Sequence, residues 1–471
     1  MPGWMAGARQ LREKERGTME HQDSAASPPN KDAAPMEEGT PVEPVPTNAT
    51  TDTQESADTS HLAHWKRAVT LFLVGQSISM FGSSIVQFAV MWYLTLETRS
   101  GLVVMLYAVF AFVPQGMLSL FGGALADRMN RKLLIIIPDA IIAITTLALA
   151  LIMVAGINDL WIILAAVTIR SIGSGFQNPA VSATIPSIVP AEHLMRVNGI
   201  NASIQGVMAL LAPAAGGAIY GLGGIVPTFF VDVVTAILGI GVMLFVRIPK
   251  LPDNPEPKSL IGDLVAGLHY TFTHRFIRWL LTVYAVVFVL IVAPSFLVPL
   301  MVTRSFGGEV WMLTGVEVAF SLGMALGGMV VGMLVRHSKM HLLLVSSVIF
   351  GLLSVAMGIA PNIYVVLALN ATVGLLVPVF STPSTTALQE STDPAFMGRV
   401  FSLVSIVFTL GMPMGMAVFG PLADVFSVET ILIGSGVVTI LFVLFSFYGL
   451  ADGRHALAES RAQQAALEVR K

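Results

Sequence analysis

The sequence predicts an all-α, polytopic membrane protein with twelve transmembrane helices arranged as two six-helix repeats. The chain is 55% hydrophobic and 12% charged, with a mean hydropathy of +0.77. Soluble domains are about 45–50% apolar and about 25% charged. Beyond Lys66, apolar runs long enough to cross a bilayer recur with short breaks, and motifs in the second half repeat motifs in the first.

Residues 1–64 differ in composition from the rest of the chain. They are rich in Pro, Ser, Thr, Ala and acids and contain almost no large apolar residue. Such a segment buries too little surface to offset the entropy of ordering, so we expect a disordered tail. It has no apolar core of the kind that defines a signal peptide. Met1 and Met19 are both possible starts of translation.

The apolar runs predict twelve helical spans, most of them of about 20 residues or more, which is the length that crosses a bilayer. The spans are 68–94, 102–125, 133–156, 160–181, 200–221, 226–246, 279–301, 311–335, 342–360, 363–388, 402–423 and 430–450. Of sixteen Lys and Arg residues outside the spans and between the tails, fourteen precede the first span or lie in alternate loops. Only Arg99 and Arg304 lie in the opposite loops. The positive-inside rule therefore predicts that both termini are cytoplasmic.

The longest internal break divides the membrane region into two halves. We expect an N-terminal six-helix bundle at 65–247, a cytoplasmic linker with an amphipathic helix at 248–276, a C-terminal bundle at 277–450 and a cytoplasmic tail at 451–471. FQNPAVSATIP (176–186) matches FSTPSTTALQ (380–389), and LMRVNG (194–199) matches MGRVFS (397–402), at offsets of 203–204 residues. A parallel repeat of two six-helix halves is a transporter architecture with its substrate site between the halves.

The loop between the second and third spans concentrates charge in a chain that is otherwise poor in it. Its pattern consists of Gly123, Asp127, Arg128, Asn130, Arg131 and Lys132. This resembles the signature Gly-x-x-x-Asp-Arg-x-Gly-Arg-Lys of the major facilitator superfamily, with Asn130 in place of a glycine at a turn that we expect to be left-handed. The resemblance implies a conformational latch between the halves; the alternative is a simple topology anchor.

Two further patterns resemble motifs of proton-driven members of this superfamily. Arg170 lies in the fourth span, followed by two glycines. The fifth span resembles the antiporter motif through Gly199, Ala212, Pro213, Gly216 and Gly217, although Met208 and Ala212 replace two of its glycines. From Trp65 to Leu450 the chain is most similar to the macrolide-efflux and enterobactin-exporter branch of drug/proton antiporters.

Four ionisable residues lie inside the predicted spans: Asp139, Arg170, Asp232 and Glu317. A charge at the centre of a membrane helix costs about 2.5–3.5 kcal/mol on insertion scales, so each needs a partner, water or a function. Asp139, Arg170, Glu317 and Asp232 are the candidates for proton coupling. A direct ion pair between Asp139 and Arg170 on the next helix is possible because Arg is long, although their depths differ by roughly two turns. A purely structural role is the alternative.

A polar stripe on the first span predicts the wall of a cavity. Gln76, Ser79, Ser83 and Gln87 recur at helical spacing on one face. By the logic of the repeat, we expect the same cavity to include Asn178, Asn201, Gln205, Asn370 and Thr382. Hydrogen bonding between helices is the alternative role for these side chains.

Together with this resemblance, these observations predict a secondary exporter of the cytoplasmic membrane, not an enzyme, that moves an amphipathic drug or macrolide outward in exchange for protons. The resemblance alone implies that the protein is bacterial. No phosphate-binding loop and no metal-ligand cluster is present, so the proton gradient is the expected energy source and no cofactor is expected. We expect a monomer in lipid that does not bind nucleic acid. The alternatives are an exporter of a siderophore or lipid-like metabolite, an uptake carrier, and a non-transporting sensor or scaffold.

Overall fold

The computed structural model describes residues 65–126, 129–248, 269–334, 337–393 and 396–458, which form helices joined by short loops. These residues belong to one compact unit, Ala57–Lys471. Among them, twelve helices are long and apolar enough to span a membrane, as the sequence predicts. The predicted tail at 1–64 and most of the predicted linker at 248–276 lie outside the described residues.

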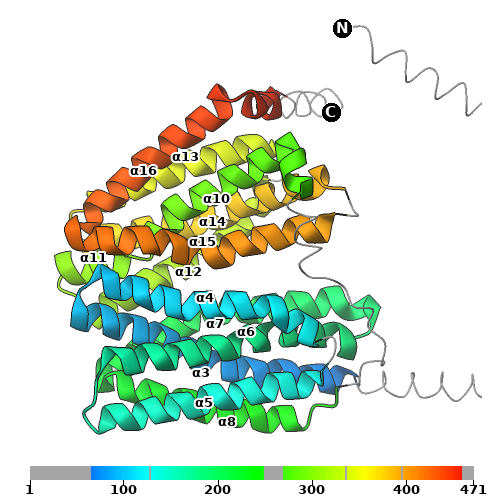
Figure 1. Ribbon diagram of the computed structural model, residues 1–471, viewed down its shortest axis with the longest axis vertical. Helices are drawn as coiled ribbons and strands as arrows, with labels where there is room; N and C mark the ends of the chain where they lie inside the picture. Colours follow the sequence, from blue (N-terminus) through cyan, green and yellow to red (C-terminus); the bar gives the residue numbers. More distant parts are fainter. Residues whose placement is uncertain (1–64, 127–128, 249–268, 335–336, 394–395, 459–471) are drawn as a thin grey trace, which may run out of the picture. The chain divides into compact units, whose positions relative to one another are not determined.

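The helices form two sets that are consecutive in the chain (Figure 1). The first set consists of α3 (Trp65–Thr98), α4 (Gly101–Ala126), α5 (Arg131–Val154), α6 (Leu160–Ile188), η1 (Ala191–His193), α7 (Leu194–Gly223) and α8 (Ile225–Leu244). The second set consists of α10 (Arg275–Ser295), α11 (Val298–Ser305), α12 (Val310–Leu334), α13 (Lys339–Gly358), α14 (Ile363–Ser391), α15 (Met397–Val425), α16 (Val428–Leu444) and η2 (Phe445–Gly449). α6 and α14 each contain 29 residues, and their first residues, Leu160 and Ile363, are separated by the offset that the sequence repeat predicts.

Several helices begin where a short polar side chain caps the first turn. Asp159 accepts a hydrogen bond from the backbone N–H of Trp161 at the start of α6. Asn362 accepts one from Val365 at the start of α14. Such caps satisfy backbone donors that have no partner inside the helix.

Asn130 is also a helix cap, which corrects the prediction that it occupies a left-handed turn. Its φ of −63° and ψ of 107° are extended, and its side chain accepts a hydrogen bond from Lys132 N at the start of α5. Asn is among the preferred residues at this position because its side-chain oxygen reaches the first turn of the helix.

The predicted span at 279–301 is not one continuous helix. α10 ends at Ser295, and α11 starts at Val298 with Pro299 in its first turn. Proline has no N–H, so Pro299 cannot donate the hydrogen bond to Ser295 O that would continue α10 into α11. The pattern of apolar residues runs through this break, so hydropathy alone predicts a single span.

Glycines let α3 and α8 approach closely. A Cβ atom built on Gly82 would lie 1.9 Å from Thr235 Oγ1 and 2.9 Å from Asp232 Cα, and one on Gly239 would lie 2.8 Å from Gly75 O. Small residues allow such contacts between membrane helices. The close approach brings Asp232 of α8 next to the polar face of α3.

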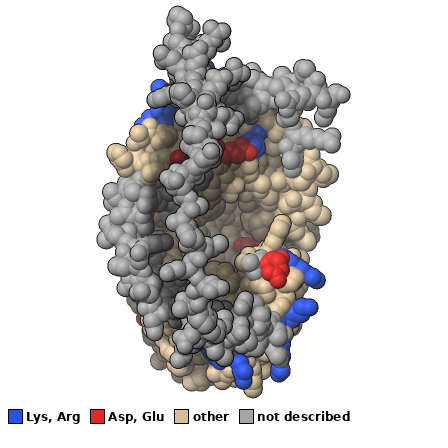
Figure 2. Space-filling view, turned by 90° about the vertical axis from the view of Figure 1, so that its right-hand side faces the viewer, with Lys and Arg blue, Asp and Glu red and all other residues tan. Residues whose placement is uncertain are grey.

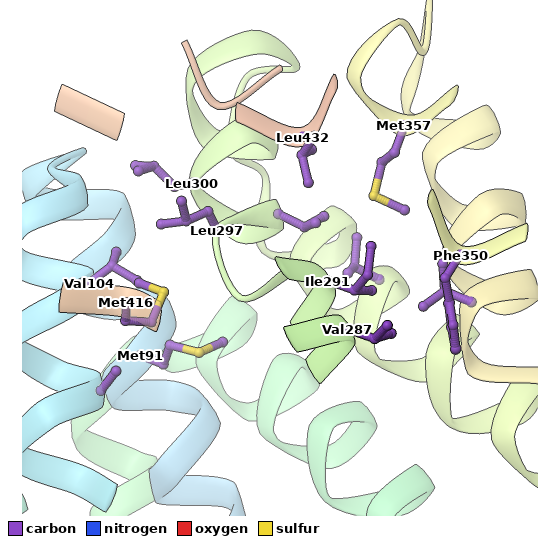
Figure 3. Close-up of a cluster of buried hydrophobic side chains, with 14 of the residues drawn as sticks. Met91, Val104, Val287, Ile291, Leu297, Leu300, Phe350, Met357, Met416 and Leu432 are labelled. Atoms are coloured by element: carbon purple, nitrogen blue, oxygen red, sulfur yellow. The ribbon is translucent and has the colours of Figure 1, made fainter. Parts of the chain in front are cut away.

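The two sets of helices, which we call the N-half and the C-half, meet through α4 against α15 and α7 against α12. A Cβ atom on Gly101 would lie 2.2 Å from Gly420 O, and one on Gly217 would lie 1.8 Å from Thr314 Oγ1. Buried apolar side chains of both halves form one cluster, in which Val104 lies next to Met416 (Figure 3).

The two ends of the halves differ. At the end where α3 finishes, Asp424 of the C-half accepts hydrogen bonds from the backbone N–H groups of Gly101 and Leu102 of the N-half. We call this the closed end. The opposite end, where α3 begins, is hollowed between the halves (Figure 2). We call it the open end.

Candidate functional site

A polar cavity of about 470 Å³ lies in the N-half, lined by residues of α3, α4, α5, α6 and α7. Seven residues that the sequence proposes for a substrate cavity line it: Gln76, Ser79, Ser83, Gln87, Asn178, Asn201 and Gln205. Asp139 and Arg170 line it as well. The cavity therefore joins the polar stripe of α3 to two of the charged residues in the spans.

Asp139 of α5 contacts the polar face of α3. Its side chain is buried, and the Ser79 hydroxyl lies 2.6 and 2.8 Å from its two carboxylate oxygens. Ser79 is neutral, and no described Lys, Arg or His forms an ion pair with Asp139. A proton can therefore join or leave this carboxylate without breaking an ion pair.

Arg170 of α6 pairs with Asp232 of α8. Its Nη1 donates to Asp232 Oδ2 and to the hydroxyl of Thr146, and its Nη2 lies 3.3 Å from Ser83 O. Asp232, which is fully buried, also accepts hydrogen bonds from Ser83 at 3.0 Å and from Thr146 at 2.9 Å. Side chains of α3, α5, α6 and α8 thus meet at one ion pair.

The ion pair of Arg170 is with Asp232 and not with Asp139, the partner that the sequence leaves possible. The sequence suggests that pairing because α5 and α6 are consecutive, but Arg170 and Asp139 lie at different depths in their helices. Asp232 begins the third turn of α8, and the glycine contacts between α3 and α8 bring it within reach of Arg170. Thr146, seven residues after Asp139, was not proposed from the sequence; its position on the same face of α5 is the signal that identifies it.

The remaining candidates are distributed differently from the prediction. Glu317 and Asn370 line a second cavity, of about 300 Å³, whose other lining residues come almost entirely from the C-half. Asn370 donates a hydrogen bond to Val316 O at 2.7 Å. Thr382 is exposed and lines neither of these two cavities, so its place in a substrate cavity stays a prediction.

The predicted latch is described only in part. Gly123 lies in α4, whereas Asp127 and Arg128 lie outside the described residues. Arg131 donates a hydrogen bond to Ala183 O at 2.8 Å, and Lys132 donates to Leu244 O and Val246 O at 2.7 and 2.9 Å. Arg131 and Lys132 therefore bind backbone carbonyls near the ends of α6 and α8 within the N-half.

The residues that resemble the antiporter motif all lie on α7 but have different surroundings. Ala212 and Pro213 are buried, Gly216 faces Ile85 of α3, and Gly217 faces Thr314 of α12. A Cβ atom on Gly199 would meet nothing within 4 Å. Gly217 is thus the member of the group that allows close contact between the halves.

A network at the closed end was not proposed from the sequence. Asp424 accepts hydrogen bonds from Ser100 Oγ at 2.9 Å, from the N–H groups of Gly101 and Leu102 at 2.7 and 2.8 Å, and from Arg304 at 2.8 Å. Arg304 also donates to Arg99 O and Ala423 O. Arg304 is one of only two bases in the set of loops that the sequence places at this end. This rarity is the feature of the sequence that could have identified it as a candidate.

Comparison with known proteins places this geometry in a family. The family described as transmembrane secretion effector matches residues 59–468. Macrolide efflux protein A of Streptococcus pyogenes is 28% identical over 386 residues, which cover 81% of this chain and 95% of that protein. The enterobactin exporter EntS of Shigella flexneri is 25% identical over 312 residues, which cover 64% of this chain and 72% of that protein.

Solved transporter structures share the fold. The nucleoside transporter NupG superposes with a TM-score of 0.64 at 14% identity, covering 81% of this chain and 100% of that one. A bacterial homologue of the human lysosomal transporter Spinster, described as inward-facing and unoccupied, gives a TM-score of 0.58 at 16% identity and covers 86% of this chain and 98% of that one. The chain belongs to the transmembrane secretion effector family of the major facilitator superfamily, and is a multi-pass membrane transporter related to bacterial efflux proteins.

Proposed function

We propose that this protein exports amphipathic small molecules across the bacterial cytoplasmic membrane in exchange for protons. The observation that carries the proposal is Asp139, a buried carboxylate that lines the polar cavity and is bound there by the neutral hydroxyl of Ser79. A carboxylate in this position can bind and release a proton inside the same cavity that a substrate would enter.

The two acids of the N-half have different roles in this proposal. Asp232 carries a charge that Arg170 balances, so the pair is neutral as a unit and holds four helices together. Asp139 has no such counter-charge among the described residues, so its protonation changes the net charge of the cavity. We assign proton coupling to Asp139 and orientation of the surrounding helices to Arg170 and Asp232.

The direction of transport rests on the relatives and on the charge of the loops. The relatives named above include a macrolide efflux protein and an enterobactin exporter. The excess of Lys and Arg in one set of loops assigns the open end to the cytoplasm by the positive-inside rule. In this orientation the polar cavity accepts substrate from inside, and opening of the closed end releases it outside.

Transport by everted membrane vesicles tests the proposal. We expect an imposed pH gradient to drive uptake of dyes and macrolides into vesicles that contain the wild-type protein, and Asp139→Asn to lose this uptake by at least tenfold. Asp159→Asn is the matched control, since Asp159 is exposed and Asn caps a helix equally well. Undiminished gradient-driven uptake by Asp139→Asn would remove Asp139 from the coupling role.

The similarity to EntS favours a siderophore as the second candidate substrate. Enterobactin therefore belongs in the same panel of compounds. Movement of enterobactin, with no movement of any macrolide or dye, would replace drug export by export of a dedicated metabolite. If none of the compounds moves under any gradient, the export proposal fails.

A further inference from the structure

The second cavity differs in chemistry from the polar one. It is enclosed mainly by α10, α12 and α14, and its volume of about 300 Å³ lies at the lower end of the range for small-molecule pockets. Six phenylalanines and Tyr284 line it. Tyr284 stacks on Phe380 with ring centroids 5.3 Å apart, and Phe408 meets Tyr284 edge to face at 5.4 Å. The wall is therefore apolar and rich in aromatic rings, some of which pack against one another.

One charged group faces this surface. Glu317 of α12 is the only ionisable acid or base in the lining apart from the phenol of Tyr284, and no Lys, Arg or His is present there. No described residue forms an ion pair with Glu317. The amide of Asn370, which also lines the cavity, donates a hydrogen bond to Val316 O. The cavity thus holds a carboxylate for which the described protein supplies no counter-charge.

A carboxylate in such surroundings must either bind a proton or pair with a cation, because an isolated charge in an apolar medium is costly. The aromatic wall favours a cation as well, since ring faces attract positive charge, most strongly where water is excluded. An apolar, positively charged molecule satisfies both the carboxylate and the rings. A neutral molecule satisfies only the rings, and an anionic molecule satisfies neither the carboxylate nor the rings.

We propose that this cavity binds the positively charged group of a lipophilic cation, with Glu317 as its counter-ion and the aromatic rings around its apolar body. Proton and cation then compete for Glu317, and binding of one cation releases one proton. This inference rests on the proposed export function, whose substrate it narrows from amphipathic molecules in general to lipophilic cations.

The two cavities are neighbours. Tyr107 lines the polar cavity and stacks on Phe296 of the second cavity, with ring centroids 6.5 Å apart and planes at 8°. Met91 of α3 lines the second cavity, and the adjacent Val90 lines the polar one. A cation held by Glu317 would therefore extend its polar part toward the serines and amides of the N-half.

Equilibrium binding of tetraphenylphosphonium to the purified full-length protein tests this assignment. Its charge is permanent and it forms no hydrogen bonds, so it reports only apolar and electrostatic recognition. Triphenylphosphine oxide is the neutral comparison. We expect Glu317→Gln to weaken tetraphenylphosphonium binding at least tenfold and to change triphenylphosphine oxide binding less than twofold. In the wild type, we expect the phosphonium to bind more weakly as the pH falls and to release protons into a weakly buffered solution.

Glu309→Gln is the matched control, because it removes the same charge from an exposed position just before α12. Equal phosphonium affinity in wild type and Glu317→Gln would overturn the assignment, and so would an equal loss in Glu309→Gln. If Glu317→Gln does not fold, labelling of wild-type Glu317 by a hydrophobic carbodiimide replaces it. We expect tetraphenylphosphonium to protect Glu317 from this reagent, and absence of protection would contradict the proposal.

Binding at equilibrium separates this inference from the export proposal. Gradient-driven transport of neutral drugs together with phosphonium binding that does not depend on Glu317 would refute the cation subsite alone. Binding that depends on Glu317, with no gradient-driven movement of any compound, would refute coupled export and leave the cation subsite supported.

Discussion

The buried ion pair of Arg170 and Asp232 shows how single residues determine the polar cavity. Arg170 has a side-chain exposure of 13% and Asp232 of 0%, so the two charges depend on each other rather than on water. Removal of one partner of a buried pair costs about 3–5 kcal/mol in soluble proteins, because the other charge is left uncompensated. Removal of both partners costs much less stability, because no uncompensated charge is left behind.

A double-mutant cycle follows from this argument. We expect Asp232→Asn and Arg170→Gln each to lower the thermal stability of the purified protein strongly, and the double variant to recover part of the loss, with a coupling energy of about 1–3 kcal/mol. Thermal unfolding in detergent measures all four proteins. Additive losses would mean that the two side chains do not stabilise each other.

At the scale of the helix, glycine decides which elements can pack together. α7 carries Gly217 against Thr314 of α12, whereas Gly221, one turn later on the same helix, would place a Cβ atom in open space. The contact at Gly217 therefore depends on the absence of a side chain, and it lies between the two halves.

We expect Gly217→Ala to push α7 away from α12 and to reduce transport several-fold, because the added Cβ atom would lie 1.8 Å from Thr314 Oγ1 and 2.8 Å from Thr314 Cβ. Gly221→Ala is the control and should transport at the wild-type rate. Adding Thr314→Gly to Gly217→Ala removes the opposing atoms and should restore transport. Vesicle uptake checks each variant, and a normal rate for Gly217→Ala would show that the contact is not limiting.

At the scale of the whole membrane unit, the network around Asp424 holds the closed end together. It joins the start of α4 to the end of α15 and to Arg304, so one carboxylate ties the two halves. Asp424 also faces the N-terminal end of α4, where the helix dipole favours a negative charge. The side chains of Arg304 and Asp424 are 29% and 32% exposed, so water weakens the pair.

We expect Asp424→Ala to shift the molecule toward a state that is open at this end, by about 1–2 kcal/mol or roughly 5- to 30-fold in the ratio of the two states. The chain contains no cysteine, so spin labels on Leu222→Cys and Phe426→Cys report the distance between the halves without interference. Longer distances in Asp424→Ala than in the parent, and no change in Glu309→Gln, are the expected result. Identical distance distributions in the parent and in Asp424→Ala would remove the network from the gating role.

The sequence by itself determined the number of spans, the repeat and the polar face of α3. These properties follow from the length of each apolar run and from helical periodicity, both of which are local in the chain. It also identified four charged residues as exceptional, since charge in a membrane helix is costly wherever the helix packs.

Tertiary structure decided which of these residues meet. Arg170 pairs with Asp232 rather than with Asp139 because the glycines of α3 and α8 allow those helices to pack closely, a contact between segments more than 150 residues apart. The placement of Glu317 in an aromatic cavity of the C-half and of Asp424 at the start of α4 likewise depends on how helices cross. Periodicity defines the face on which a side chain lies, but only the packing of distant helices determines what that face contacts.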